Sequence, residues 1–344
     1  MTTKQMQVNP HQSIHQAGPA RLAGIVRRRV LTALMAILAV GLSLAETQAQ
    51  VGQSPKNSSA KLQPGDIVYV DSGDAIDGGF VVKVDPATGE KTVIASGGLL
   101  QLPFGVVIDA NGQLVVSDSG RLIGINPDTA AQRLIADNSR GALGWPCGLA
   151  IDRSPSVLAA NLRAVVRVNL NSGRIQTVSA GGRLLYPMDV AVAATGDLIV
   201  LDIAFPPEII RVSPTGAQTV IARGGLLNRP QAIAVQGDHI YVTDVATSDG
   251  NFGVGRVIDV NALTGAQSVA AEGNYLVGPV GITVDAQGQL VVGDPYTINP
   301  KSPDLYDGGI IRINPVTHEQ TLIARGEGAF VNPRGLVVVQ GLSN

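Results

Sequence analysis

Short runs of apolar residues alternate with polar turns from residue 64 to residue 341. The runs are rich in Val, Ile and Leu and are bounded by Gly, Pro, Asn and Asp, which is typical of β-strands joined by tight turns. Helical spacing of apolar residues is absent from these runs. The pattern therefore predicts an all-β domain.

The runs recur as a unit, which is the sequence signature of a repeat architecture. Six prolines mark the unit at spacings of 43, 41, 43, 49 and 54 residues: Pro103, Pro146, Pro187, Pro230, Pro279 and Pro333. An apolar run such as "GVVID" follows each proline, and runs of the types "QLVVSD", "RLIGIN" and "QRLIA" complete the unit. Four-stranded units of this length arranged in a ring form a β-propeller, so the sequence predicts a six-bladed β-propeller of four-stranded blades.

The two ends of the repeat region complete one another. The first unit begins with "GDIVYVD", a strand of the second type, whereas "PRGLVVVQG" near the C-terminus is a strand of the first type. We expect the C-terminal strand, Pro333 to Val339, to pair into the first blade, which begins at Gly65, and so to close the ring.

Residues 1–49 differ from the repeats and predict an export signal. Arg21 and Arg27–Arg29 precede an uncharged apolar run from Val30 to Leu44, which at about 15 residues is shorter than a typical membrane span of about 20. Small residues near Ala45 and Ala49 suit cleavage, so we expect a secreted or periplasmic protein without a stable membrane span; an uncleaved anchor is the alternative. Residues 50–63 read as a flexible spacer, and residues 64–344 as the propeller.

Charge and cysteine content exclude some functions. Removal of five basic and one acidic residue with the signal, from totals of 25 and 27, leaves 20 basic and 26 acidic residues and a net charge of −6. This charge and the lack of a basic cluster argue against nucleic-acid binding. Cys147 is the one cysteine, so no intramolecular disulfide forms. We expect a monomer.

The phrases "PFGVVIDANGQLVVSD" from Pro103 and "PVGITVDAQGQLVVGD" from Pro279 resemble the repeat of the NHL and regucalcin/gluconolactonase-like six-bladed propellers. That superfamily contains lactonases, lyases and non-catalytic binding domains. The resemblance implies Asn, Asp or Glu metal ligands directly after the repeat prolines, at the mouth of the central channel. This chain instead has there Phe104, Cys147, Met188, Gln231, Val280 and Arg334. These are not the oxygen ligands of a Ca²⁺ site, so no metal site is predicted there, and Asp189 is the one carboxylate nearby.

Acidic residues end five of the second strands: Asp71, Asp118, Asp202, Asp244 and Asp294. Asn161 takes their place in the remaining unit. Carboxylates at such positions can accept backbone N–H bonds in the following turn. The alternative, which we keep for Asp71, Asp244 and Asp294, is that they contact a ligand.

Long loops follow the second strand in the first, fifth and sixth blades, which become neighbours when the ring closes. They carry acidic and tyrosine residues: Asp74, Asp77, Asp249, Asp304, Asp307, Tyr296 and Tyr306. We predict one contiguous acidic wall, and "DAIDGG" could hold Ca²⁺ through side-chain and backbone oxygens; the alternative is surface loops without function.

Trp145 and Tyr186 precede two repeat prolines on the same predicted face, opposite this wall. They either stack on a ligand or cap the blade cores. With Asp189 and Arg334 they complete our candidate ligand-binding residues.

Two functions remain. The first is an exported binding or interaction module that takes a small molecule, glycan or protein on the face of the long loops, with no cofactor. The alternative is a divalent-cation-assisted lactonase-like hydrolase or lyase. Catalytic residues are not assigned, because the two histidines that follow the signal, His239 and His318, fall on the opposite face.

Overall fold

The fold is described from a computed structural model, which covers residues 61–73, 78–140, 143–245, 254–299, 302–306, 308–326 and 332–341. The predicted export signal and most of the predicted spacer lie outside these residues. Within them no helix is long and apolar enough to cross a membrane.

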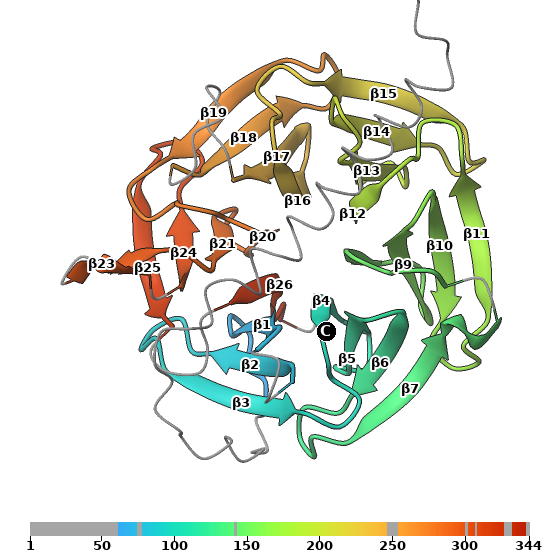
Figure 1. Ribbon diagram of the computed structural model, residues 1–344, viewed down its shortest axis with the longest axis horizontal. Helices are drawn as coiled ribbons and strands as arrows, with labels where there is room; N and C mark the ends of the chain where they lie inside the picture. The colour runs from blue at the N-terminus through green and yellow to red at the C-terminus, as the bar shows by residue number, and fades with distance from the viewer. Residues whose placement is uncertain are drawn as a thin grey trace, which may run out of the picture. The chain divides into compact units, whose positions relative to one another are not determined.

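Six four-stranded antiparallel sheets form the blades of a ring (Figure 1). Blade 1 consists of β26 (Pro333–Val338), β1 (Ile67–Asp71), β2 (Phe80–Val84) and β3 (Lys91–Ser96). Blade 2 consists of β4 (Pro103–Ile108), β5 (Leu114–Asp118), β6 (Arg121–Ile125) and β7 (Gln132–Asp137). Blade 3 consists of β8 (Leu149–Ile151), β9 (Ser156–Asn161), β10 (Ala164–Asn169) and β11 (Ile175–Ala180). Blade 4 consists of β12 (Pro187–Val192), β13 (Leu198–Asp202), β14 (Glu208–Val212) and β15 (Gln218–Arg223). Blade 5 consists of β16 (Pro230–Gln236), β17 (His239–Asp244), β18 (Arg256–Asn261) and β19 (Gln267–Glu272). Blade 6 consists of β20 (Gly281–Val284), β21 (Leu290–Asp294), β24 (Gly309–Ile313) and β25 (Gln320–Arg325).

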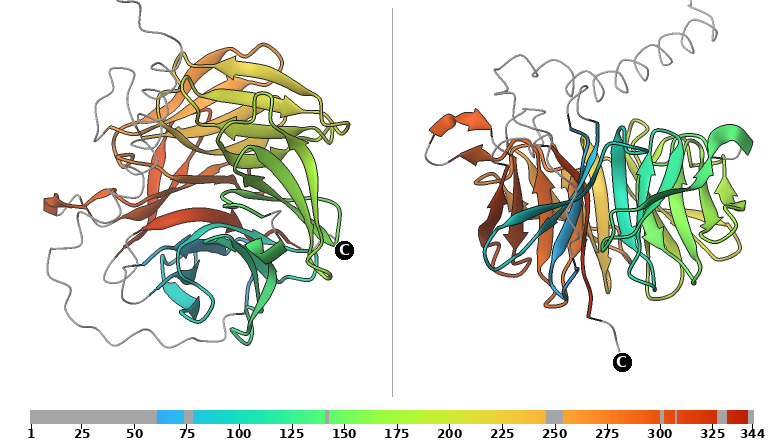
Figure 2. Two further views of the ribbon diagram at one scale, coloured as in Figure 1. Left: turned by 45° about the vertical axis from the view of Figure 1, so that its right-hand side comes forward. Right: turned by 90° about the horizontal axis from the view of Figure 1, so that it is seen from below.

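Two elements lie outside the blades. A 3₁₀ helix, η1 (Asn138–Arg140), follows blade 2, and a hairpin of β22 (Ile298–Asn299) and β23 (Ser302–Tyr306) projects from blade 6 (Figure 2). The sequence pattern predicted a loop at the position of this hairpin.

The ring closes as the chain ends predicted. Strand β26 pairs antiparallel with β1, with Ile67 opposite Val338 and Asp71 opposite Pro333. Reciprocal backbone bonds extend the pairing, since the Gly65 N–H donates to the Val339 oxygen and the Val339 N–H to the Asp66 oxygen, both at 2.8 Å. Blade 1 is thus built from both ends of the repeat region, and the prediction of closure is confirmed.

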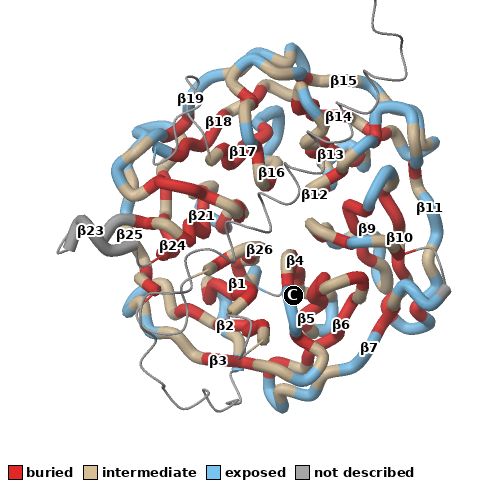
Figure 3. The backbone as a smooth tube through the Cα atoms, viewed as in Figure 1, coloured by how far each residue is buried: buried red, intermediate tan, exposed pale blue. Residues whose placement is uncertain are grey.

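The hydrophobic core lies between adjacent blades. One buried cluster combines residues of blades 1 and 2, and another combines blades 6 and 1 through side chains such as Val291 and Val338. The second strands are the most buried, because both of their faces pack against a neighbouring blade, whereas the fourth strands carry most of the exposed positions (Figure 3). Burial on both faces explains why the second strands read as continuous apolar runs rather than alternating ones.

A glutamine at the start of the fourth strand ties four blades to the blade before. Gln132 accepts the Leu99 N–H at 2.8 Å and donates to the Gly97 oxygen at 3.1 Å. Gln218 and Gln267 make the same pair of contacts in later blades, and Gln320 accepts the Tyr275 N–H at 3.2 Å and donates to the Glu272 oxygen at 3.5 Å. These ties connect the outer strands, which follow one another around the circumference in Figure 1.

Candidate functional site

The inner strands of the six blades surround a central channel of about 360 Å³. All six residues that directly follow the repeat prolines line it: Phe104, Cys147, Met188, Gln231, Val280 and Arg334. Their predicted position is therefore confirmed. Two kinds of connection lie on one face of the ring. The 4–1 connections run from the fourth strand of one blade to the first strand of the next, and the 2–3 turns join the second and third strands of a blade. We call this the upper face, and the mouth of the channel lies on it.

A β-bulge at the start of the first strand sets the direction of these side chains. In blade 2 Pro103 pairs with Asp118, and the register then shifts before Gly105, so that Phe104 is the extra residue. The same shift occurs in blades 4, 5 and 1. Because bulges redirect a side chain out of the ladder, Arg334 reaches the channel mouth by the same local geometry as Phe104.

Asp189 is an exception in a ring that is otherwise made of glycine and alanine. The equivalent positions are Gly105, Gly148, Ala232, Gly281 and Gly335. At Gly148 a Cβ would lie 1.8 Å from Oδ1 of Asp189, and at Gly281 it would lie 2.0 Å from the Arg334 carbonyl oxygen. Glycine is thus needed for close approach of neighbouring inner strands, and in blade 3 it makes room for the carboxylate.

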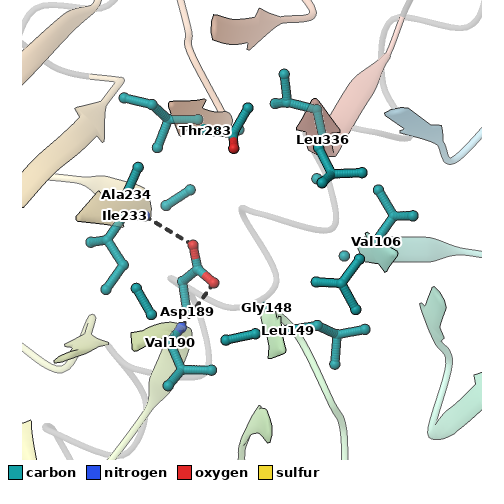
Figure 4. Close-up of a pocket in the computed structure, with 18 of the residues that line it drawn as sticks. Val106, Gly148, Leu149, Asp189, Val190, Ile233, Ala234, Thr283 and Leu336 are labelled. Atoms are coloured by element: carbon teal, nitrogen blue, oxygen red, sulfur yellow. Dashed lines mark hydrogen bonds between the residues drawn. The ribbon is translucent and has the colours of Figure 1, made fainter. Parts of the chain in front are cut away.

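The Asp189 carboxylate points into the channel and joins two blades (Figure 4). Oδ1 accepts the Val190 N–H at 2.8 Å, and Oδ2 accepts the Ile233 N–H of blade 5 at 2.9 Å. Burial raises the pKa of Asp189 to about 7, although the two N–H donors oppose the shift. Both oxygens therefore have backbone partners, and burial makes Asp189 easier to protonate than an exposed carboxylate.

Arg334 is the only charged residue that directly follows a repeat proline. Its Nε donates to Oγ of Ser72 at 3.2 Å, and its guanidinium lies 5.0 Å from the centre of the Phe104 ring. The Phe104 ring in turn meets Trp145 edge-on, with 6.2 Å between ring centres. Burial lowers the pKa of Arg334, opposed by Tyr296, Asp71 and Cys147. Trp145, Phe104 and Arg334 thus form a continuous cluster, which we call the mouth cluster.

The acids that end the second strands hold the 4–1 connections. Oδ2 of Asp294 accepts the N–H groups of Val277 and Gly278 at 2.7 and 2.9 Å, while Oδ1 accepts the Tyr296 N–H at 2.8 Å. Asp71, Asp118, Asp202 and Asp244 bind the same connection in their own blades.

Asp71, Asp244 and Asp294, which we proposed as ligand contacts, are completely buried, so a ligand in the channel does not reach them without local rearrangement. Burial also raises the pKa of Asp294 to about 6. The bond to the following turn was the other role predicted for these acids. The bond to the preceding connection was not predicted, because in blade 6, for example, that connection lies 16 and 17 residues before Asp294 in the sequence.

Exposed apolar side chains gather on the upper face of blades 2 to 4. They are Leu102 at 43%, Trp145 at 41%, Leu162 at 55%, Leu185 at 38% and Phe205 at 89% relative exposure. We call this set the apolar platform. Tyr186, proposed with Trp145 as a stacking residue, is half-buried beside Leu185. Backbone bonds join some of the loops that carry these residues, with the Ile203 N–H donating to the Tyr186 oxygen and the Gly181 N–H to the Arg163 oxygen.

Arginines border the apolar platform. Arg183 and Arg223 both contact Oε1 of Glu208, at 3.0 and 3.2 Å, and Arg163 is exposed in the turn beside Leu162. Glu208 is buried and carries both of these contacts. It therefore holds Arg183, from the connection between blades 3 and 4, and Arg223 of β15 together.

The predicted acidic wall falls largely outside the described residues. Asp74, Asp77, Asp249 and Asp307 lie there, and Asp304 and Tyr306 belong to β23, whose side chains are not described. The three blades that carry the wall are neighbours, as predicted. Among the described residues no group of three or more His, Cys, Asp and Glu side chains is arranged to hold a metal ion, and the Ca²⁺ prediction for "DAIDGG" falls mainly on residues that are not described.

The surroundings of Cys147 and His239 argue against a catalytic role for either side chain. Burial, reinforced by Asp189, raises the pKa of Cys147 to about 12, so its thiol stays protonated and is a weak nucleophile. His239 begins β17, stacks on Tyr241 and places Nδ1 2.8 Å from Oδ2 of Asp259.

Comparison with known proteins identifies the class of fold. No protein-family model and no curated protein matches the chain. A chain in the crystal structure of the Nidogen/Laminin complex is similar, with 13% identity and a TM-score of 0.60 over 79% of this chain and 97% of that chain. Virginiamycin B lyase from Staphylococcus aureus is similar at 16% identity and a TM-score of 0.45, over 64% and 69% of the two chains.

At these identities the comparisons support a six-bladed β-propeller and nothing finer. The resemblance to the NHL and regucalcin/gluconolactonase-like families is not confirmed by them. With 951 similar chains among solved structures, the fold is widespread, and function has to be argued from the site.

Proposed function

We propose that the protein is an exported interaction module that binds another protein through the apolar platform. The observation that carries this proposal is the exposure of five large apolar side chains on three adjacent blades, with Phe205 at 89%. Large apolar side chains exposed on one face of a protein indicate an interaction site. The export signal predicted in residues 1–49 places the encounter in the periplasm or outside the cell.

The chemistry of the platform favours a protein over a glycan. Its bordering residues Arg163, Arg183 and Arg223 suit a partner that carries acidic groups around an apolar centre, because aromatic and arginine residues dominate the energetics of protein interfaces. The 2–3 turns are short here, only Ser119–Gly120 in blade 2 and Leu162–Arg163 in blade 3. A broad partner can therefore reach the side chains. The propeller-like chain in the Nidogen/Laminin complex is a precedent for this fold within a protein complex.

The test is affinity capture from the exported protein fraction with matched variants. Leu162→Asp/Phe205→Asp places charge in the platform, whereas Leu263→Asp/Val316→Asp changes two equally exposed apolar residues, at 71% and 83%, in turns between third and fourth strands. We expect a captured protein to be lost by the first variant and kept by the second, with both variants retaining the wild-type melting temperature. Equal capture by wild type and the platform variant would refute the proposal.

A further inference from the structure

Arg334 carries a positive charge that the described part of the protein does not neutralise by direct contact. None of the ion pairs among the described residues includes Arg334. Its one hydrogen bond in that part of the chain uses Nε, so the two terminal nitrogens make none. A guanidinium presents five N–H donors, and a partly desolvated one is stabilised by an oxyanion that accepts several of them together.

The acid that acts on the Arg334 charge is already engaged. Asp71 influences the Arg334 charge, but its Oδ1 accepts the Gly73 N–H at 2.8 Å and its Oδ2 accepts the Asn332 N–H at 2.9 Å. The carboxylate is completely buried in these bonds. Its charge lowers the cost of burying Arg334 without occupying the terminal nitrogens.

Ser72 holds the guanidinium in place. Its Oγ accepts hydrogen bonds from Arg334 Nε at 3.2 Å and from Asn332 Nδ2 at 2.7 Å. Ser72 is buried and is not among the residues that line the channel. An anion beside Arg334 can therefore receive bonds from the two terminal guanidinium nitrogens, while Ser72 positions Nε.

The surroundings of Arg334 select the rest of the ligand. Phe104 fixes the guanidinium by a cation–π contact, Trp145 exposes 41% of its surface next to Phe104, and Val280 and Met188 continue the rim. Apolar and aromatic groups bind such a rim. The channel volume of about 360 Å³ suits a small organic molecule or the last residue of a peptide.

We propose that the channel mouth is a binding site for a carboxylate joined to an apolar or aromatic group, with Arg334 as the anion ligand and Ser72 as a positioning residue that holds its guanidinium. Phe104 is a positioning residue and Trp145 contacts the apolar part. The site shares Trp145 with the apolar platform but none of its other four residues, and Arg334 lies in the channel, outside the platform.

Fluorescence of Trp145 tests the site, because it is the only tryptophan in the chain. The probes are benzoate and benzamide, which have the same shape and differ in charge. We expect a saturable change with benzoate and none with benzamide. Arg334→Gln should weaken benzoate binding roughly ten- to hundredfold, Arg334→Lys should weaken it less, and the control Arg163→Gln should leave it unchanged.

Equal binding of benzoate and benzamide, or unchanged benzoate affinity in Arg334→Gln, would overturn the proposal. Tighter binding of inorganic phosphate than of benzoate would overturn the ligand class. N-acetylphenylalanine and a hexapeptide ending in phenylalanine separate a free acid from a chain terminus: binding of either supports the site, and the tighter probe identifies the source. Binding that persists in Leu162→Asp/Phe205→Asp separates this site from the platform.

Discussion

Asp189 and Arg334 are opposite charges on the wall of one channel, and they differ in how the fold treats them. Asp189 has a backbone N–H for each oxygen, one from its own strand and one from blade 5. Arg334 has a serine hydroxyl for Nε and an aromatic ring beside its plane, and its terminal nitrogens have no hydrogen bond among the described residues.

This difference separates scaffold from site. A buried charged side chain whose hydrogen bonds are all made to the backbone holds strands together. A charged side chain with unused N–H donors is instead a binding site for a ligand that accepts hydrogen bonds. We therefore expect changes at Asp189 to act on stability and changes at Arg334 to act on binding.

The largest effect is expected from Gly148→Val. Its Cβ would overlap Oδ1 of Asp189 at 1.8 Å and crowd the Asp189 backbone at 2.8 Å, and overpacking of this kind costs about 3 kcal/mol or more. Urea unfolding of Gly148→Val measures the loss. Adding Asp189→Gly should recover part of it, because only the clash with the carboxylate is relieved; a double variant as unstable as the sum of the two single variants would contradict the contact.

Asp189→Ala comes next. It leaves the Val190 and Ile233 N–H groups without their acceptor, at about 1–3 kcal/mol for each buried donor. Asp189→Asn keeps one acceptor and should lose about half as much. A bridging role is supported if the free energy of unfolding is highest for wild type, lower for Asp189→Asn and lowest for Asp189→Ala. An Asp189→Ala variant with the wild-type free energy of unfolding would contradict it.

The pH dependence of stability provides a third test. The folded pKa of Asp189 is raised to about 7 from an ordinary value of 3.8, so between these values the folded state binds the proton and the unfolded state does not. Stability contributed by this group therefore falls as pH rises from about 4 to 7 and stays low above it.

Asp294, with a pKa of about 6, acts in the same direction, so the informative quantity is the difference in melting temperature between wild type and Asp189→Asn. This difference should shrink between pH 5 and pH 8. A constant difference would contradict the raised pKa.

The rate at which the Cys147 thiol reacts depends on both Asp189 and Arg334. Asp189 raises the pKa of this thiol and Arg334 lowers it, while burial dominates. At pH 8 a small thiol reagent should react slowly with wild type, several-fold faster with Asp189→Asn and more slowly with Arg334→Gln, because the thiolate is the reactive form. The urea-unfolded proteins should all react alike, and faster reaction of Arg334→Gln than wild type would reverse the assigned signs.

The smallest effect is expected for Arg334→Gln on stability. The residue gives up one hydrogen bond of 3.2 Å and a cation–π contact at a partly exposed site, so the change should stay within about 1 kcal/mol. A loss as large as that of Asp189→Ala would show that Arg334 is a structural residue.

The sequence predicted the repeating parts of this molecule well. Strand types, six blades, closure through β26 and the position of Phe104 and Arg334 at the channel mouth all follow from proline spacing and apolar runs. These features are local or periodic, so one unit predicts the next.

Features that depend on contacts between strands were missed. The second bond of each strand-end acid and the Asp189 bridge to Ile233 join residues that are 15 or more positions apart, and nothing in a single strand encodes them or the bulge after the repeat proline. One signal was available: Asp189 occupies a position where four of the six units have glycine. The exposure of Phe205 was also not predicted, because the sequence does not show whether an apolar residue in a loop is buried or exposed.

Thermal unfolding with and without saturating benzoate tests the division of roles most directly, since a ligand that binds only the folded state raises its melting temperature. Asp189→Asn should melt below wild type and still gain the full benzoate shift, and Arg334→Gln should melt close to wild type and gain a much smaller shift at the same benzoate concentration. The opposite pattern, with Arg334→Gln unstable yet shifted by benzoate as much as wild type, would contradict the assignment of Asp189 to the scaffold and Arg334 to the site.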